Sequence, residues 1–285
     1  MIGRRSFLGA TVLAGIPGLS QAAPHLEDEL KRLEALSGGR LGVGLLDSSS
    51  DVPRGWRGNE RFPMCSTFKA FASAALLHRV DAGQEKLDRR VTYAKADLVP
   101  YSPTTEKHVR SGLTLAEICE AAITLSDNTA GNLLLANIGG PAGLNAFARS
   151  LGDNVTRLDR TEPTLNEALP GDRRDTTSPN AMAATLSKLV LGTALSPASR
   201  AQLATWLVAA RTGDDRLRAG LPKSWRIGDK TGTGERGTAN DVAVIWPIDH
   251  KPMVVTVYLT GASGNAATKN AIIADVARAV VTVLG

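Results

Sequence analysis

Ser66 and Lys69 place a hydroxyl and an amine three residues apart in the segment Ser66-Thr67-Phe68-Lys69. On a helix this spacing is about one turn, so the two side chains can meet. A serine hydroxyl attacks a carbonyl only after a base takes its proton, and burial in an apolar wall lowers the pKa of a lysine toward that task. The pair therefore predicts nucleophilic catalysis by Ser66. The alternative is a helix-capping serine beside an unrelated lysine.

Ser126-Asp127-Asn128 forms a second polar group. The Ser126 hydroxyl could pass a proton to a leaving nitrogen, and the Asn128 amide could hold both a substrate carbonyl and a neighbouring lysine. Because serine, aspartate and asparagine all favour helix N-termini, the alternative is a polar helix junction.

Lys230-Thr231-Gly232 ends a predicted strand, and Thr233 follows it. A strand edge can pair with an extended substrate, and the Lys230 ammonium with the two threonine hydroxyls can bind a carboxylate. Gly232 would let the substrate approach closely. A hairpin turn is the alternative interpretation of the same segment.

Glu162 and Asn166 lie four residues apart in the segment 159–175, which lacks periodicity and carries two prolines. Such a segment predicts a long surface loop, and loops of this length are often functional. A carboxylate and an amide at this spacing could grip one water, as a general base for hydrolysis requires. The alternative for Glu162 is a solvated loop glutamate.

Helices should supply the scaffold between these groups. Residues 66–77 are apolar nearly all round, which predicts a buried helix. Thr114 and Glu117 form a capping-box pattern that begins another helix. A loop at 98–103, bracketed by prolines, presents Tyr101.

Strand patterns lie toward both ends of the chain. Apolar patterning predicts strands at 41–47, 226–230, 242–246 and 253–260, and terminal helices at 26–36 and 272–283. We therefore expect an α/β fold of the α+β type, in which an antiparallel sheet is flanked by terminal helices and carries an inserted all-helical domain. The cleft between the two parts is the natural place for a site. The expected boundaries are 1–22 for a signal peptide, 23–58 and 214–285 for the sheet domain, and 59–213 for the helical domain.

The composition argues against several functional classes. The 285 residues are 43% hydrophobic and carry a net charge of +5, with the basic residues scattered. Nucleic-acid binding would need a clustered basic face, so we expect no nucleic-acid partner, whereas a mild positive charge suits an anionic small substrate. The histidines are isolated and form no zinc motif, so we expect no metal and no cofactor.

The first residues have the pattern of an export signal. Arg4-Arg5 precedes an apolar run, 7–19, that is too short to span a bilayer, and small residues for a signal peptidase follow at 20–22. We expect export by the twin-arginine route to the periplasm or the medium, with no stable membrane association after processing. A frayed helix with two chance arginines is the alternative.

Taken together, the motifs resemble those of class A serine β-lactamases. Ser-x-x-Lys, Ser-Asp-Asn and Lys-Thr-Gly mark these enzymes and the penicillin-binding proteins. Here they occur in the family's order, with the Glu162–Asn166 motif between the second and the third. The resemblance covers the chain from about Pro24 onward, and the segments 61–69 and 170–172 are similar to the Burkholderia and mycobacterial subgroup. It implies a monomeric hydrolase of penicillins and cephalosporins that confers antibiotic resistance.

The resemblance also assigns a role to each residue. Ser66 would be the nucleophile, with Lys69 and, through a water, Glu162 as the disputed bases that activate it. Ser126 would relay a proton to the lactam nitrogen, and the backbone N–H groups of Ser66 and Thr233 would form the oxyanion hole. The remaining groups would bind the substrate or the water: Asn128 the acylamide side chain, Lys230, Thr231 and Thr233 the carboxylate, Tyr101 the wall of the cleft, and Asn166 the hydrolytic water. An ion pair between Arg160 and Asp175 would close the neck of the loop.

One departure from the family concerns the carboxylate site. Many members carry an arginine shortly before the Asn-Asp that follows Lys-Thr-Gly, and it is absent before Asn240-Asp241. Arg216 matches a subgroup that supplies this arginine from an earlier segment. The alternative for Arg216 is a surface charge.

A second departure concerns the cysteines. Two cysteines in an exported chain would by default form one disulfide. In family members that bridge the cysteine at position 119, however, its partner stands where Ser73 stands here, and in several members that bridge the cysteine at position 65, its partner stands where Gly234 stands here. The resemblance therefore implies two free thiols.

Two rival functions stay open. A penicillin-binding D-alanyl-D-alanine peptidase shares three of the motifs but lacks the deacylating glutamate, and a β-lactam or peptidoglycan sensor would acylate and then stall. Glu162 and the short chain favour the hydrolase.

Overall fold

The computed structural model describes residues 26–48 and 52–284. Within them, a five-stranded antiparallel sheet has the strand order β2-β1-β9-β8-β7. Its strands are β1 (Arg40–Asp47), β2 (Arg54–Trp56), β7 (Arg226–Thr233), β8 (Ala239–Trp246) and β9 (Met253–Thr260). Because β1 pairs along its whole length with β9, the two ends of the chain form one sheet, as predicted.

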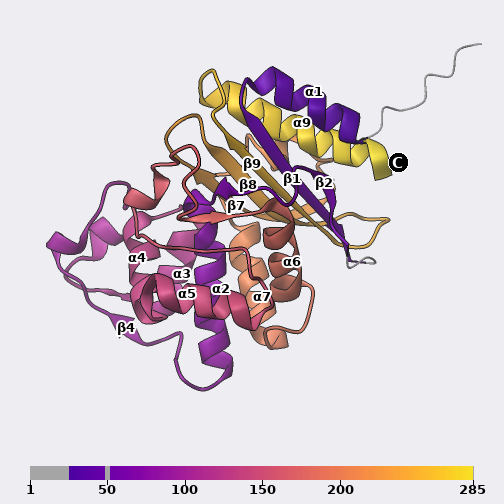
Figure 1. Ribbon diagram of the computed structural model, residues 1–285. Coiled ribbons are helices and arrows are strands. Elements are labelled where there is room, and N and C mark those ends of the chain that lie inside the picture. The colour runs from indigo at the N-terminus through magenta and orange to yellow at the C-terminus, as the bar shows by residue number, and fades with distance from the viewer. Residues whose placement is uncertain (1–25, 49–51, 285) are drawn as a thin grey trace, which may run out of the picture.

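Helices cover both faces of this sheet (Figure 1). One face carries α1 (Leu26–Ser37) and α9 (Ala266–Leu284), which lie side by side. The other face carries the helical part of the chain, with α2 (Phe68–Asp81), α3 (Leu115–Thr124), α4 (Asn128–Asn137), α5 (Gly140–Ser150), α6 (Pro179–Val190) and α7 (Pro197–Val208). The short elements are β3 (Phe62–Pro63), η1 (Cys65–Thr67), β4 (Arg90–Val91), η2 (Lys95–Asp97), η3 (Thr105–His108), β5 (Leu113–Thr114), η4 (Thr164–Asn166), β6 (Thr176–Thr177) and α8 (Leu217–Gly220).

Both faces of β8 are buried because each faces a separate apolar core. Val242 and Val244 join the core of the helical part, whereas Ala243 and Ile245 join the core beneath α1 and α9. Successive side chains of a strand point to opposite faces. Burial on both sides therefore explains why this strand is a continuous apolar run in the sequence.

Most predicted elements are confirmed, with shifted ends. β7 continues past Lys230 to Thr233, so the Lys-Thr-Gly motif lies inside the strand and not at its end. Ser66 lies in the 3-10 turn η1, directly before α2, and not within the α-helix itself. Thr114 caps α3 through the predicted capping box. The chain therefore presents Ser66 at the junction between the sheet and the helical part.

The predicted signal peptide at 1–22 lies outside the described residues. Within 26–48 and 52–284, no helix is both long enough and apolar enough to span a membrane. The same residues contain no cluster of three or more His, Cys, Asp or Glu side chains that could hold a metal ion.

Candidate active site

Ser66 and Lys69 meet at the start of α2, as predicted, within a stretch, 65–77, in which every residue is buried. Lys69 Nζ donates a hydrogen bond to Ser66 Oγ at 2.9 Å. It also donates to the backbone carbonyl of Ser126 at 2.8 Å and to Oδ1 of Asn128 at 2.6 Å. The first two sequence motifs therefore meet at one amine.

Glu162 reaches the same hydroxyl from the long loop. Its Oε1 accepts a hydrogen bond from Ser66 Oγ at 3.0 Å and lies 3.0 Å from Lys69 Nζ, and both charged side chains are fully buried. The Asn166 amide donates to the other oxygen, Oε2, at 2.5 Å. Burial lowers the pKa of Lys69, and the negative charge of Glu162 partly offsets that shift. Both candidate bases therefore contact Ser66 Oγ directly.

Asn132, which the sequence analysis missed, fixes the backbone of Glu162. Its amide nitrogen donates to the Glu162 carbonyl oxygen at 3.0 Å, and its Oδ1 accepts the Glu162 N–H at 2.9 Å. Asn132 lies about one helical turn beyond Asn128 on α4, so helical spacing from the Ser-Asp-Asn motif could have identified it. The Glu162–Pro163 peptide bond, next to these contacts, is cis.

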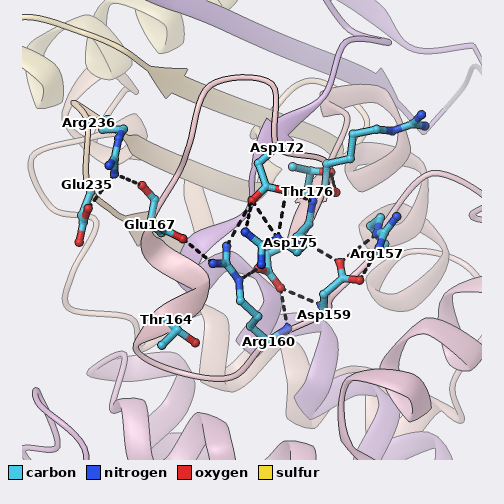
Figure 2. A network of polar contacts seen from close by, with 12 residues as sticks. Arg157, Asp159, Arg160, Thr164, Glu167, Asp172, Asp175, Thr176, Glu235 and Arg236 are labelled. Atoms are coloured by element: carbon cyan, nitrogen blue, oxygen red, sulfur yellow. Dashed lines mark hydrogen bonds and ion pairs between the residues drawn. The ribbon is translucent and has the colours of Figure 1, made fainter.

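Arg160 and Asp175 close the neck of the loop, which confirms the predicted ion pair. Arg160 Nε lies 2.6 Å from Asp175 Oδ2, and the same guanidinium lies 2.6 Å from Glu167. The other Asp175 oxygen accepts the backbone N–H groups of Asp159 and Arg160. Figure 2 shows that this network continues through Glu167 to Arg236 on the β7–β8 turn. One buried carboxylate thus ties the two ends of the loop together.

Lys230 reaches Ser126 from β7. Its Nζ donates to Ser126 Oγ at 3.0 Å, and Lys69 Nζ lies 3.5 Å from the same hydroxyl. Burial, and then the positive charge of Lys69, lowers the pKa of Lys230 to about 7. Ser126 therefore lies between two amines of lowered pKa, where its hydroxyl can relay a proton.

A cavity of about 390 Å³ opens over these groups. It is lined by Ser66, Tyr101, Ser126, Asn128, Asn166, Thr212, Arg216, Thr231 and Thr233. Its volume lies within the range of small-molecule pockets, roughly 300–1,000 Å³. The Ser66 side chain therefore faces a ligand-sized space surrounded by hydroxyls, amides and one guanidinium.

Residues 25–284 match the Beta-lactamase enzyme family. The chain is 51% identical to Beta-lactamase Toho-1 of Escherichia coli over 97% of both chains. It is 50% identical to Beta-lactamase OXY-1 of Klebsiella oxytoca, over 91% of this chain and 89% of that one. The solved structure of an ancestral (GNCA) class A β-lactamase is 65% identical, with a TM-score of 0.90, and the match covers 91% of this chain and 100% of that one. The chain belongs to the class A β-lactamase family.

A second solved structure agrees with this assignment. The putative class A β-lactamase PenP from Rhodopseudomonas palustris is 67% identical, with a TM-score of 0.90, and the match covers 90% of this chain and 99% of that one. The protein is accordingly a serine hydrolase that opens β-lactams.

Arg216 of this β-lactamase is buried and is not a surface charge. It is 8% exposed, and burial lowers its pKa. Its guanidinium donates to Thr233 Oγ1 at 2.8 Å, to the carbonyl oxygens of Gly232 at 2.9 Å and Asn240 at 2.6 Å, and to Asn270 at 2.9 Å. Arg216 therefore fixes the Thr233 hydroxyl at the edge of the β-lactamase cavity.

Thr212 and Gly232 have contacts around the active-site cavity that the sequence did not indicate. Thr212 Oγ1 lies 2.6 Å from Thr231 Oγ1 and lines the cavity. A Cβ atom on Gly232 would lie 2.8 Å from the Met64 carbonyl oxygen, so glycine lets β7 approach the segment before Ser66. The predicted role of Gly232 in substrate approach stays a prediction.

Tyr101 stands at the mouth of the cavity with 61% of its surface exposed. Its carbonyl oxygen accepts the Asn128 N–H at 2.9 Å. The Asn128 amide nitrogen donates to the Pro100 carbonyl oxygen at 2.9 Å. The proline-bracketed loop is thereby fastened to the start of α4, and Tyr101 lines the same cavity as Ser66.

Cys65 and Cys119 are both free and buried, which confirms the expectation of two thiols. A Cβ atom on Gly234 would lie 2.6 Å from Cys65 Sγ, so a glycine does face this thiol. Burial raises the pKa of Cys65 and raises that of Cys119 to about 12. Thiols of raised pKa form little thiolate, so neither cysteine competes with Ser66 as a nucleophile.

Proposed function

We propose that this β-lactamase opens the lactam ring through an acyl-enzyme on Ser66 and then hydrolyses the ester with a water that Glu162 activates. The observation that carries this proposal is the position of the Glu162 carboxylate, 3.0 Å from Ser66 Oγ and held by Asn166. A carboxylate at that distance can accept the proton of the hydroxyl during acylation and the proton of a water during deacylation.

Acylation begins when Lys69 or Glu162 takes the proton of Ser66, whose oxygen attacks the lactam carbonyl. The backbone N–H groups of Ser66 and Thr233 stabilise the oxyanion. As the C–N bond breaks, Ser126 passes its proton to the nitrogen. Its contact with Lys230 Nζ at 3.0 Å supports this role, because an amine of lowered pKa can replace the proton.

The wall formed by β7 binds the substrate carboxylate. The hydroxyls of Thr231 and Thr233 line the cavity, and Arg216 and Lys230 supply positive charge behind them. On the opposite side, Asn128 binds the acylamide group and Tyr101 covers it. Penicillins and cephalosporins both carry these two features, so we propose both as substrates.

Intact-protein mass spectrometry of Glu162→Ala mixed with benzylpenicillin tests the mechanism. Loss of a general base commonly slows a step by about 10²–10⁴-fold, so the variant should accumulate a stable adduct on Ser66 while the wild type does not. Glu162→Gln, which keeps the shape of the side chain, should behave alike. Glu167→Gln, which changes a carboxylate of the same loop away from Ser66, should still turn over. A persistent adduct on the wild type would contradict the proposal and favour a peptidase or a sensor.

We also propose that the enzyme is exported through the twin-arginine route and acts as a monomer. The Arg4-Arg5 pair supports this route. Replacing both arginines by lysine should leave the activity in the cytoplasm, and normal periplasmic activity would contradict the route. The assignment to the Burkholderia and mycobacterial subgroup rests on the segments 61–69 and 170–172 alone. The curated relatives named above come instead from Escherichia coli and Klebsiella oxytoca.

A further inference from the structure

A second cavity, of about 580 Å³, lies against the loop that carries Glu162 and shares no lining residue with the active-site cavity. We call it the rear-loop cavity. The loop contributes residues 168–173, and the sheet contributes the ends of β1 and β9. Four arginines line it together with a single carboxylate: Arg40, Arg61, Arg173, Arg236 and Asp172.

Two of these arginines have acidic partners, and the carboxylate has a basic partner. Arg40 pairs with Glu60, and Arg236 pairs with Glu235. Asp172 pairs with Arg174, which lies outside the lining. The charge of these residues is therefore largely neutralised.

Arg61 and Arg173 differ, because neither forms a salt bridge with any residue in 26–48 or 52–284. Arg61 donates to the Thr176 hydroxyl at 3.0 Å. Burial and the positive charges of Arg173 and Arg157 lower the pKa of Arg61, with partial opposition from Asp153. An added anion would relieve this repulsion.

The same cavity has an apolar wall. Pro63, Ala168, Leu169 and Pro170 line it together with Arg61 and Arg173. Its volume lies within the range of about 300–1,000 Å³ that is typical of small-molecule sites. The lining therefore fits a ligand that is anionic at one end and apolar at the other.

We propose that the rear-loop cavity binds an organic anion with one carboxylate and a short apolar chain. Arg61 and Arg173 hold the carboxylate, and Leu169 and Pro170 cover the chain. The ligand rests against residues 168–173, so its binding also slows the opening of this part of the loop. This site is separate from β-lactam hydrolysis and is tested without a β-lactam.

Calorimetric titration of the enzyme with octanoate, beside the uncharged octanamide, tests the site. Octanoate should bind saturably, and octanamide should bind at least about tenfold more weakly, because charge-assisted hydrogen bonds to the carboxylate are lost. Arg61→Gln should weaken octanoate binding by roughly tenfold, and the exposed Arg173→Gln by about threefold. Arg61→Lys should recover part of the affinity. Hydrogen exchange of the amides in 168–173 should slow when octanoate is added.

Arg110→Gln is the charge-matched control, since it removes one exposed positive charge away from the cavity. It should leave octanoate binding unchanged. Equal binding of octanoate and octanamide, or equal weakening by the Arg110 and Arg61 variants, would overturn the proposal. So would an affinity that depends on Arg216 and not on Arg61, because the anion would then occupy the active-site cavity.

Discussion

Arg236 donates a hydrogen bond to the backbone carbonyl of Glu167 at 2.5 Å and so joins the β7–β8 turn to the loop that carries Glu162 (Figure 2). The neighbouring Glu235 N–H donates to the Asn166 carbonyl oxygen at 2.9 Å. Asn166 in turn holds the Glu162 carboxylate at 2.5 Å. The turn is thus fastened to two consecutive residues of the loop, one of which holds the Glu162 carboxylate that we propose as the general base.

Arg236→Gln should lower the rate of deacylation more than that of acylation, because Asn166 and Glu162 lose part of their support. The Arg236 side chain is 41% exposed, so the loss should be modest, about 2–10-fold for one hydrogen bond of roughly 0.5–1.5 kcal/mol. Stopped-flow kinetics with a cephalosporin separates the two steps, and Arg236→Lys should recover part of the rate. Glu235→Gln, which keeps the backbone contact, is the control. Equal slowing of both steps would contradict a positioning role.

Arg160→Ser should destabilise the protein and loosen the loop. It removes the ion pairs to Asp175 and Glu167 and leaves the Asp175 carboxylate, 1% exposed, without its cation. Breaking a fully buried pair costs about 3–5 kcal/mol. Because Arg160 is 18% exposed, we expect a smaller loss, about 2–3 kcal/mol. Denaturant unfolding measures this loss.

The looser loop should also favour bulky cephalosporins over penicillins, which the ratio of the two kcat/KM values measures. Asp175→Asn, which keeps an acceptor for the backbone N–H groups, should have the smaller effect on stability. An unchanged stability and substrate ranking in Arg160→Ser would show that the pair is no clamp.

Arg216→Ala should reduce kcat/KM for benzylpenicillin by about 10–100-fold, the equivalent of one charge-assisted contact. Some stability should be lost as well, since the Gly232 and Asn240 carbonyls lose their donor. The methyl ester of benzylpenicillin separates the two effects, because it lacks the negative carboxylate that we propose Arg216 attracts. The variant should lose much less activity on the ester than on the acid. Equal losses would make Arg216 a structural residue only.

Asp241→Asn should become more stable relative to the wild type as the pH rises. Asp241 is fully buried, and its Oδ1 has no hydrogen-bond partner among the described residues. Burial and the negative charge of Asp229 raise the pKa of Asp241. In the wild type, the folded state therefore binds the Asp241 proton more tightly than the unfolded state does. This contribution to the free energy of unfolding is fully present below the unfolded pKa of about 3.9, and it is lost as the pH rises through the pKa of Asp241 in the folded protein.

Asparagine does not titrate and can still accept the Leu217 N–H through its oxygen. The difference in unfolding free energy should grow by up to about 1.4 kcal/mol per pH unit within that window. Thermal unfolding of both proteins between about pH 4 and about pH 8 measures it. Parallel stability curves would show that Asp241 is ionised throughout.

Local spacing in the sequence determined the chemistry of this protein and much of its fold. Ser66 and Lys69 lie one turn apart, and Glu162 and Asn166 lie within one short motif, so their contacts depend on few dihedral angles. Apolar periodicity is local for the same reason, and it predicted β1, β9 and both terminal helices.

Only the tertiary structure decided which of these motifs meet and at which atoms. Glu162 contacts Ser66 across 96 positions of the chain, and Lys230 contacts Ser126 across 104. Such contacts arise when the helical part packs on the sheet, and a linear pattern does not contain that geometry. The burial of Arg216 came from the same packing, which surrounds an otherwise ordinary arginine with backbone carbonyls.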